Sequence, residues 1–583
     1  MSILTRFEEV IIISNSKRWT HEEKYFLFYW KLLTSEYSSA FFTIPACGIR
    51  KLLNEAIEYL QWDNNMAKTQ QENILNEIDL SICEHPIFEH GQLKDESVHL
   101  RKALTSSNNR ESLEPIISSL VKKIENYSLI RYHIDAIKLI YSDSSKRKYH
   151  KIDRLLESLL CELLNEGHSV RYLHNWSKGV SMSEKTFHEF LDSIIDNLGP
   201  EKRQEYQCYL SFELPKDGSP VKSFNNIIYL ERPDDCNDDR WGGFFDSDFD
   251  YASVKVDASD FQYAADLAGY VLENFLKTID LCNRSKSGKE RAYDPSIMTE
   301  ILVITKDNQV HKTRRVKAYG PIELKNVADF IKLMDFQRPI NTNTYQKINR
   351  AVYWSVQSNQ PYIEASLTNL WSSMESLFSD FDGRIIDRLT RFVPYYWGMY
   401  YMETYTGVMR NHLRQLERQY KHQDGHVLAA VSKEEDFSKN NVAEFLVNNY
   451  EELLALCERA DVFKRLLTDY VSLWIDEGKL YRRIKRISKE AQFDLQRIYR
   501  LRNKLVHQAY IAPIEMASNV KQLQFYFKIT MNNIIFNYTR CPKLTMEEIL
   551  ITKEESYKQY LETIKGDVNG QFDEIIYPKH LYI

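Results

Sequence analysis

Hydrophobic residues recur every three to four positions over most of this chain, a spacing that places them on one face of an α-helix. Thr20 and Glu23 have the spacing of a capping box and stand directly ahead of an apolar run, so they predict a helix start. Ser181 and Glu184 have the same spacing, and a Gly-Pro pair stops the apolar stripe that follows them. That stripe consists of Phe187, Phe190, Leu191, Ile194, Ile195 and Leu198. We therefore expect a helical N-terminal domain over residues 1–198.

The pattern changes after this stop. Short β-rich runs at 207–214, 227–231 and 300–305 predict strands, and the segment 261–281 between them has helical periodicity. Strands interleaved with a helix indicate a small α/β (α+β) domain, which we place at residues 199–338.

Helical spacing returns over residues 339–545. After Pro361 one helix face carries Ile363, Leu367, Leu370, Trp371, Met374, Leu377 and Phe378. Further helical segments are expected at 385–420, 440–476, 489–509 and 517–537. The remaining residues, 546–583, form a charged C-terminal tail in which we expect one more helix. The predicted fold class is therefore mainly α, with a helical N-terminal region, a small α/β domain in the middle and a C-terminal helical bundle.

Composition agrees with long helices and excludes several functions. Glycine (18) and proline (15) are scarce among the 583 residues, which disfavours a turn-rich all-β fold. The net charge of −6 argues against non-specific coating of nucleic acid. The eight cysteines are scattered without a CxxC pair, so we expect a reducing cytoplasm and no zinc module, metal or cofactor. No apolar run approaches the roughly 20 residues that span a bilayer, so no membrane partner is expected.

The candidate chemistry lies in the run from Arg502 to His507. On a helical wheel Arg502 falls in the middle of the apolar face, where a guanidinium is costly unless an anion meets it. His507 falls nearly opposite, and Asn503 lies one turn before it. Three arrangements would bring Arg502 and His507 together: a helix that ends near Val506, an Arg502 side chain that wraps around the helix, or a second subunit that completes the pocket.

These residue types suit cleavage of RNA without a metal. Histidine moves protons near neutral pH, and arginine holds a phosphate and stabilises charge on phosphorus. Asparagine can orient the imidazole or contact the substrate. Basic residues outnumber acidic ones over 482–504, and such a patch attracts a polyanion, although a basic helix is also a common solvated surface. We predict RNA contacts for Arg486, Arg497, Arg500 and Lys504.

Three segments of the chain resemble a known family. Residues 499–507, Tyr-Arg-Leu-Arg-Asn-Lys-Leu-Val-His, resemble the R-x4–6-H signature of HEPN domains, which are all-helical modules. Residues 370–378 resemble the first long helix of the Apea-like HEPN group, and residues 384–392, with their spaced arginines, resemble its second helix. The resemblance covers residues 340–540 and implies an HEPN-like bundle there.

The resemblance also implies an activity. Many HEPN proteins are metal-independent endoribonucleases that act as dimers in toxin–antitoxin and abortive-infection (anti-phage) systems. By this resemblance Arg502 would bind phosphate, His507 would be the catalytic histidine, and Asn503 would be the polar residue that follows the arginine. Glu375 would support Arg502 or form a purely structural salt bridge.

The implied partners are RNA, tRNA among the candidates, and a second copy of the chain in a homodimer or higher homo-oligomer. An antitoxin or sensor is a further possible partner, and the N-terminal region would gate the nuclease. The alternative is a non-catalytic HEPN module that only binds RNA or a partner.

Weaker signals are read as structural. Three alternating carboxylates, Asp246, Asp248 and Asp250, would suit a cation, but an EF-hand needs glycine where Tyr251 stands, so an exposed acidic loop is favoured. A cluster without standard zinc spacing consists of Cys83, His85, His90 and His99. An aromatic run that could stack on RNA bases, or form core or a dimer interface, consists of Tyr395, Tyr396, Trp397, Tyr400, Tyr401 and Tyr405.

Overall fold

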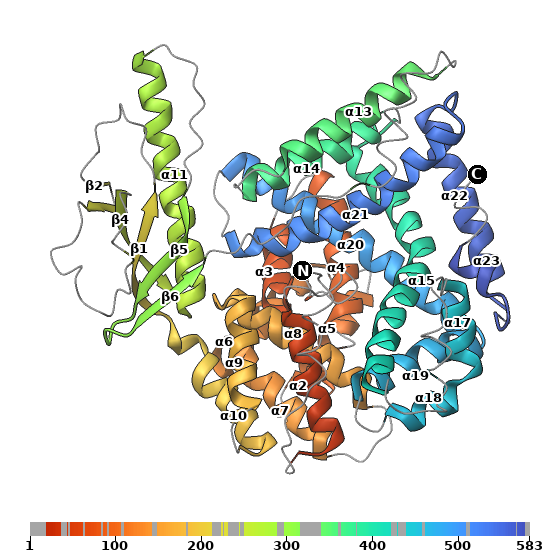
Figure 1. Ribbon diagram of the computed structural model, residues 1–583, viewed down its shortest axis with the longest axis horizontal. Coiled ribbons are helices and arrows are strands. Elements are labelled where there is room, and N and C mark those ends of the chain that lie inside the picture. Colours follow the sequence, from red (N-terminus) through yellow and green to blue (C-terminus); the bar gives the residue numbers. More distant parts are fainter. Residues whose placement is uncertain are drawn as a thin grey trace. The chain divides into compact units, whose positions relative to one another are not determined.

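The structure is a computed structural model (Figure 1). It describes residues 19–35, 44, 47–61, 65–82, 85–89, 93–105, 110–142, 148–181, 185–212, 223–224, 227–230, 244, 250–287, 297–314, 324, 340–358, 363–379, 382–420, 428, 439–457, 461–508, 513–566 and 568–577. The predicted fold class is confirmed, because the described chain is mainly helical with one small α/β region. Contacts group the chain into two compact units: residues 1–33, 37–158 and 319–583 form one, and residues 34–36 and 159–318 form the other.

The N-terminal part of the larger unit is helical as predicted. Its elements are α2 (His21–Thr34), α3 (Ile49–Leu60), α4 (Asn65–Ser81), the short 3-10 helix η2 (Pro86–Phe88), α5 (Lys94–Thr105), α6 (Arg110–Tyr127), α7 (Leu129–Ser142) and the first part of α8 (Lys148–Asn165). Residues 159–165 of α8 belong to the other unit. The capping box at the start of α2 is confirmed. The Glu23 amide donates to Thr20 Oγ1 at 3.3 Å, and the Thr20 amide donates to Glu23 Oε2 at 2.7 Å.

The C-terminal part of the larger unit is a second set of helices. They are α13 (Thr342–Gln357), α14 (Ile363–Leu377), α15 (Ile385–Tyr420), α17 (Lys439–Asn448), α18 (Tyr450–Leu456), α19 (Asp461–Ile475), α20 (Lys479–Gln508), α21 (Pro513–Arg540), α22 (Met546–Thr563) and α23 (Phe572–Ile576). The expected segment 440–476 is three helices rather than one. The expected segment 489–509 begins ten residues earlier, at Lys479, because the basic residues before 489 continue the same helix. In the C-terminal tail, α22 packs against α15.

Helices α15 and α20 pack against each other in opposite directions. The Arg384 charge lies near Tyr499, Ser488 Oγ donates to the Pro394 carbonyl at 3.4 Å, and a Cβ at Gly398 would lie 3.4 Å from Ile484. That Cβ would also lie only 2.8 Å from Ser488 Oγ and from a ring carbon of Tyr557, so the two helices approach too closely for a larger residue. Most of the aromatic run on α15 is therefore core: Tyr396, Tyr401 and Tyr405 are buried.

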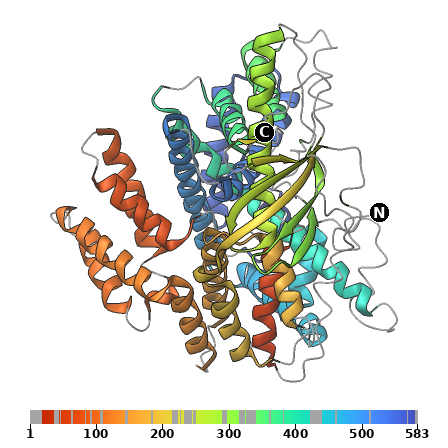
Figure 2. The ribbon, with the colours of Figure 1, turned by 90° about the vertical axis from the view of Figure 1, so that its left-hand side faces the viewer.

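The α/β unit contains α9 (Val170–Ser181), α10 (Phe187–Leu198), η4 (Pro200–Lys202) and α11 (Phe261–Ser287) beside one sheet. The strands are β1 (Gln204–Phe212), β2 (Ser223–Phe224), β3 (Ile227–Leu230), β4 (Asp250–Ala258), β5 (Ile297–Ile304) and β6 (Val310–Arg314). Their order is β2-β3-β4-β1-β5-β6, and every neighbouring pair is antiparallel (Figure 2). Small and branched residues on one sheet face, such as Cys208 and Val254, pack against Ala264, Ala268 and Leu272 of α11.

One predicted helix start is wrong by several residues. Helix α10 begins at Phe187 and is capped by Thr186, whose side chain accepts from the Glu189 amide in a complete capping box. The predicted box at Ser181 and Glu184 is not used: Ser181 instead ends α9, and residues 182–184 lie outside the described residues. The predicted stripe and its end are confirmed, because Phe187 and Leu198 are buried and Gly199 caps the helix.

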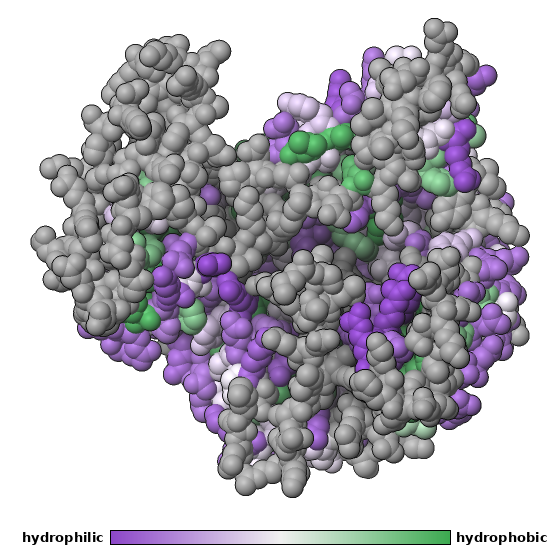
Figure 3. Space-filling model, in the orientation of Figure 1, coloured by the Kyte–Doolittle hydropathy of each residue, from purple (hydrophilic) through white to green (hydrophobic). Residues whose placement is uncertain are grey.

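The described part of the chain holds no helix that is both long and apolar enough to cross a membrane. Figure 3 shows one face of the molecule, on which the described side chains are mainly hydrophilic and the hydrophobic ones form small separate patches.

Candidate functional site

The predicted motif lies in the last two turns of α20. This helix runs without interruption from Lys479 to Gln508, two residues beyond Val506, so position 507 still belongs to the helix. Pro513 does not shorten α20; it starts α21, where a missing amide hydrogen costs nothing. Since successive residues are about 100° apart, Arg502 and position 507 lie about 140° apart around the helix. The His507 side chain lies outside the described residues.

Arg502 has an unusual environment for an arginine on a packing face. Its side chain is partly buried, and its Nη1 donates to Asn503 Oδ1 at 3.2 Å. Its Nε is buried without a hydrogen-bond partner, and no carboxylate among the described residues pairs with the guanidinium. A desolvated cation without a counter-charge is costly, and an anionic ligand would remove that cost.

Arg497 and Arg500 have the opposite environment. Arg500 is 2% exposed; its guanidinium donates two hydrogen bonds to Glu55 Oε2 of α3, at 2.9 and 3.1 Å, and lies 3.6 Å from Glu77 of α4. Arg497 is 7% exposed and pairs with Glu77 and with Asp494, the latter at 3.1 Å. Both arginines, predicted to contact RNA, are packed inside the larger unit, so neither is open to a ligand in this arrangement.

The other two residues predicted to contact RNA also have carboxylate partners but are more exposed. Lys504 Nζ lies 2.6 Å from Glu58 of α3, and both side chains are about one-third exposed. Arg486 pairs with Glu490 one turn along α20, at 2.8 Å, and both are close to half exposed. Exposed pairs of this kind are weak and exchange readily with other anions.

Despite burial, the charge of Arg500 on α20 lowers the pKa of Glu55 on α3. Burial acts to raise the pKa of the Glu55 carboxyl, but the charge of Arg500, with smaller contributions from Lys51 and Arg497, outweighs burial and holds this pKa below its usual value. On the other side of Arg497, burial raises the pKa of Asp494 to about 6, against hydrogen bonds from Tyr526 and Gln522.

Glu375 does not reach Arg502. Its carboxylate accepts a hydrogen bond from Trp371 Nε1 at 2.7 Å, within the same helix α14. The buried Trp371 ring in turn packs against Tyr499, with ring centroids 5.7 Å apart. Glu375 therefore orients the aromatic residue that joins α14 to the helix carrying the motif, and among the described residues it forms neither the pair with Arg502 nor another salt bridge.

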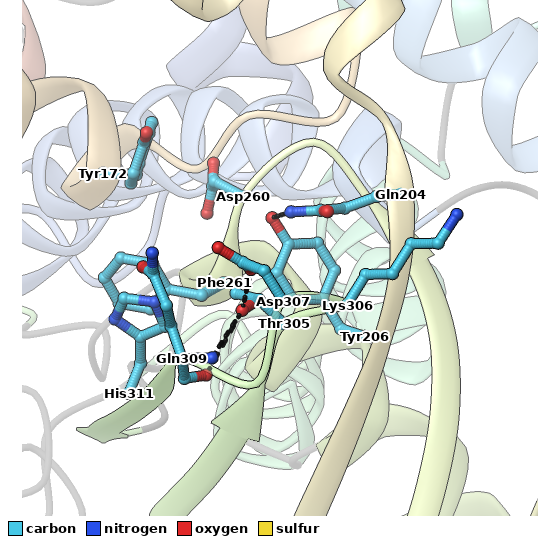
Figure 4. A pocket seen from close by; sticks show the side chains of 10 residues that line it. All are labelled: Tyr172, Gln204, Tyr206, Asp260, Phe261, Thr305, Lys306, Asp307, Gln309 and His311. Carbon is cyan, nitrogen blue, oxygen red and sulfur yellow. Dashed lines mark hydrogen bonds between the residues drawn. The ribbon is translucent and has the colours of Figure 1, made fainter.

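A second candidate site lies in the α/β unit and has no counterpart among the predicted residues. It is a cavity of about 540 Å³ at one end of the sheet (Figure 4). The Phe261 and His311 rings stack at 4.2 Å, and Tyr172 meets Phe261 edge-on at 5.7 Å. Asp260 and Lys306 add a carboxylate and an exposed ammonium to the lining.

The Asp260 carboxylate of this cavity is already engaged by hydrogen bonds within the protein. Asp260 accepts from the amides of Ser169 and Tyr263, at 2.8 and 2.7 Å, and its Oδ2 lies 3.4 Å from the Nδ1 of His168. Asp260 thus caps the first turn of α11 and holds Ser169, whose own side chain caps α9. The cavity can hold a small polar molecule against aromatic rings. Its lining residues come from separate stretches between residues 172 and 311, so no local sequence motif predicts the cavity.

The weaker candidates gain no support. Among the described residues no cluster of three or more metal-ligating side chains occurs. Asp246 and Asp248 lie outside the described residues, as do Cys83 and His90, while the backbone of Asp250 begins β4. His85 is buried against His133, with ring centroids 5.7 Å apart.

Comparison with family models, with curated proteins and with solved structures finds no match to this chain. The HEPN resemblance therefore rests on the sequence segments 370–378, 384–392 and 499–507 alone.

Proposed function

We propose that this protein is a metal-independent endoribonuclease of the HEPN type, acting as an anti-phage or abortive-infection effector. The observation that carries the proposal is the contrast among the cations of α20. Arg497, Arg500 and Lys504 each have a carboxylate partner, whereas Arg502 has none among the described residues. A phosphodiester is the anion that such a guanidinium would accept.

In the proposed reaction an RNA 2′-oxygen attacks the adjacent phosphorus and the bond from phosphorus to the 5′-oxygen breaks. His507 would take the 2′-hydroxyl proton and pass it on to the departing 5′-oxygen. Arg502 would stabilise the charge that develops on the phosphoryl oxygens, held in place by Asn503. The products are a 2′,3′-cyclic phosphate and a 5′-hydroxyl, so no metal or cofactor is required.

The continuous helix makes a second subunit the favoured way to complete this site. Arg502 and position 507 lie about 140° apart around α20, so one chain presents them on different faces. In a homodimer with facing α20 helices, Arg502 of one subunit would meet His507 of the other.

Growth on expression tests the proposal in cells. We expect the wild-type protein to arrest growth and both His507→Ala and Arg502→Ala to relieve the arrest at equal protein levels. Arg482→Ala, at an exposed position of the same helix, is the matched control and should stay toxic. Toxicity that survives both motif substitutions would favour the alternative, a non-catalytic module that binds RNA or a partner.

A further inference from the structure

A polar groove lies where α4, α15 and α20 meet, all within the larger unit. Its volume is about 290 Å³. The side chains used below are Asn73, Arg391, Tyr395, Lys489, Gln492 and Phe493, and we call their cavity the α20 groove. None of the six belongs to the predicted motif.

The groove carries two cations that are open to a ligand, and the carboxylate that also lines it, Asp387, pairs with Arg384 at 2.9 Å. Lys489 is exposed; its ammonium lies over the Phe493 ring, 5.0 Å from the centroid, and no carboxylate among the described residues pairs with it. Arg391 pairs with Glu554 through one of its terminal nitrogens, but its side chain is still 52% exposed. A cation that is held by an aromatic ring and lacks a carboxylate is free to meet a phosphate.

Two side-chain amides line the same groove without partners. Asn73 of α4 and Gln492 of α20 are each partly buried, and neither forms a hydrogen bond with the described protein. Each amide offers donors and an acceptor, the combination that reads the edge of a nucleobase. Tyr395 stacks on Tyr557, with ring centroids 4.8 Å apart, and gives the groove a rigid aromatic wall.

The position of the groove relates it to the motif. Counting about 100° per residue, Gln492, Asn503 and position 507 fall on one side of α20, within about 60° of one another. At 1.5 Å per residue, Asn503 lies about 16 Å along the helix from Gln492. The groove and the motif therefore lie on the same side of α20, separated by Gln496, which is buried against Gln70 of α4, and by Tyr499, which packs on Trp371 of α14.

We propose that the α20 groove binds one nucleotide of a single-stranded RNA, with its phosphate at Lys489 and Arg391 and its base against Asn73 and Gln492. The strand must be single, because the base edges are accessible to side chains only when the base is unpaired. The proposal deepens the proposed nuclease function, on which it rests for the identity of the ligand.

Binding of a fluorescent single-stranded RNA to the full-length His507→Ala protein tests the groove without cleavage. Lys489→Ala is expected to weaken binding about fivefold and to lower the salt-dependence slope by about 1, and Gln492→Ala to weaken binding about threefold with the slope unchanged. Lys485→Ala is the matched control: this lysine is also exposed, stands one turn earlier on α20, rests over the Tyr481 ring at 5.5 Å and does not line the groove. It should change affinity less than twofold.

The outcomes separate the groove from the nuclease. If Lys485→Ala weakens binding as much as Lys489→Ala, the surface is merely basic and the groove proposal fails. If His507→Ala abolishes RNA cleavage but neither groove substitution changes affinity, the nuclease stands and the groove falls. If the groove substitutions weaken binding while cleavage survives loss of both Arg502 and His507, the groove proposal stands and the assignment of cleavage to the HEPN-type motif fails. Adenosine monophosphate serves as the free-nucleotide probe. If neither adenosine monophosphate nor the RNA binds, the groove proposal is overturned.

Discussion

The Arg500 guanidinium donates two hydrogen bonds to the Glu55 carboxylate, across 445 residues of sequence. With Glu77 and Glu58, this carboxylate holds α3 and α4 against the basic side of α20, next to the proposed motif. The cations that the sequence offers to RNA are therefore largely committed within the chain. Arg502 and Lys489 are cations of the same helix that keep no carboxylate partner among the described residues.

Removing Glu77 should destabilise the larger unit. Glu77 is 2% exposed and pairs with both Arg497 and Arg500, so Glu77→Ala leaves two buried guanidinium groups short of a counter-charge. We expect a loss of about 3 kcal/mol in urea unfolding. The control is Glu490→Ala, which breaks an exposed pair with Arg486 and should cost less than about 0.5 kcal/mol. Equal effects of the two substitutions would contradict the buried network.

Gly398→Ala should also destabilise, although alanine is the better helix former. The added methyl would lie 2.8 Å from Ser488 Oγ and from the Tyr557 ring, so α15 and α20 would have to separate. A cost of about 1–3 kcal/mol is expected, whereas Gly179→Ala in α9, with nothing within 4 Å, should be neutral or stabilising. Thermal unfolding of the two variants measures the difference, and a stabilised Gly398→Ala protein would rule out the close approach.

Glu157 should make stability fall as pH rises. Burial raises the pKa of this carboxyl to about 7, against a hydrogen bond from Tyr29, while an exposed glutamate titrates near 4.5. Between these values the folded state binds the proton more tightly than the unfolded state, so stability is lost as pH rises through about 7. Other groups titrate in the same range, so the test is the difference between wild type and Glu157→Gln at pH 5 and pH 8. Glu157→Gln should lose less stability over this range than wild type, and parallel curves would contradict the raised pKa.

Glu375 should prove to be a positioning residue rather than a catalytic one. Its carboxylate accepts from Trp371 Nε1, and a glutamine oxygen can accept the same bond. Glu375→Gln should therefore keep RNA cleavage within about twofold of wild type, with an unchanged pH profile of the rate. Glu375→Ala should lower stability by about 1 kcal/mol through the lost bond. A hundredfold loss of cleavage in the glutamine variant would assign Glu375 a direct chemical role.

Local signals in the sequence predicted the fold well where neighbours along the chain decide the structure. The Thr20–Glu23 capping box and the stripe of α14 are local, and both are confirmed. The start of α10 was missed because two capping pairs compete within eight residues, and Thr186 with Glu189 forms the observed box. Both boxes satisfy the same spacing rule, so sequence alone does not choose between them.

The surroundings of the candidate site could be predicted only in part, because the carboxylates near it come from distant segments. Arg497 and Arg500 read as exposed cations on a basic helix until Glu55 and Glu77, more than 400 residues earlier, are placed beside them. The groove amide of Asn73 comes from the same distant helix as Glu77. Periodicity identified the cost of Arg502 on a packing face but gave no indication of which carboxylates the neighbouring cations would find.

Cleavage of a short RNA by the purified protein in the presence of EDTA tests the central claim most directly. We predict products with a 2′,3′-cyclic phosphate and a 5′-hydroxyl, a rate lowered at least about 100-fold by His507→Ala and by Arg502→Ala, and no cleavage where a 2′-deoxynucleotide replaces the attacking one. Arg482→Ala should cleave at the wild-type rate. Cleavage that needs a metal, or that persists in both motif variants, would contradict the account.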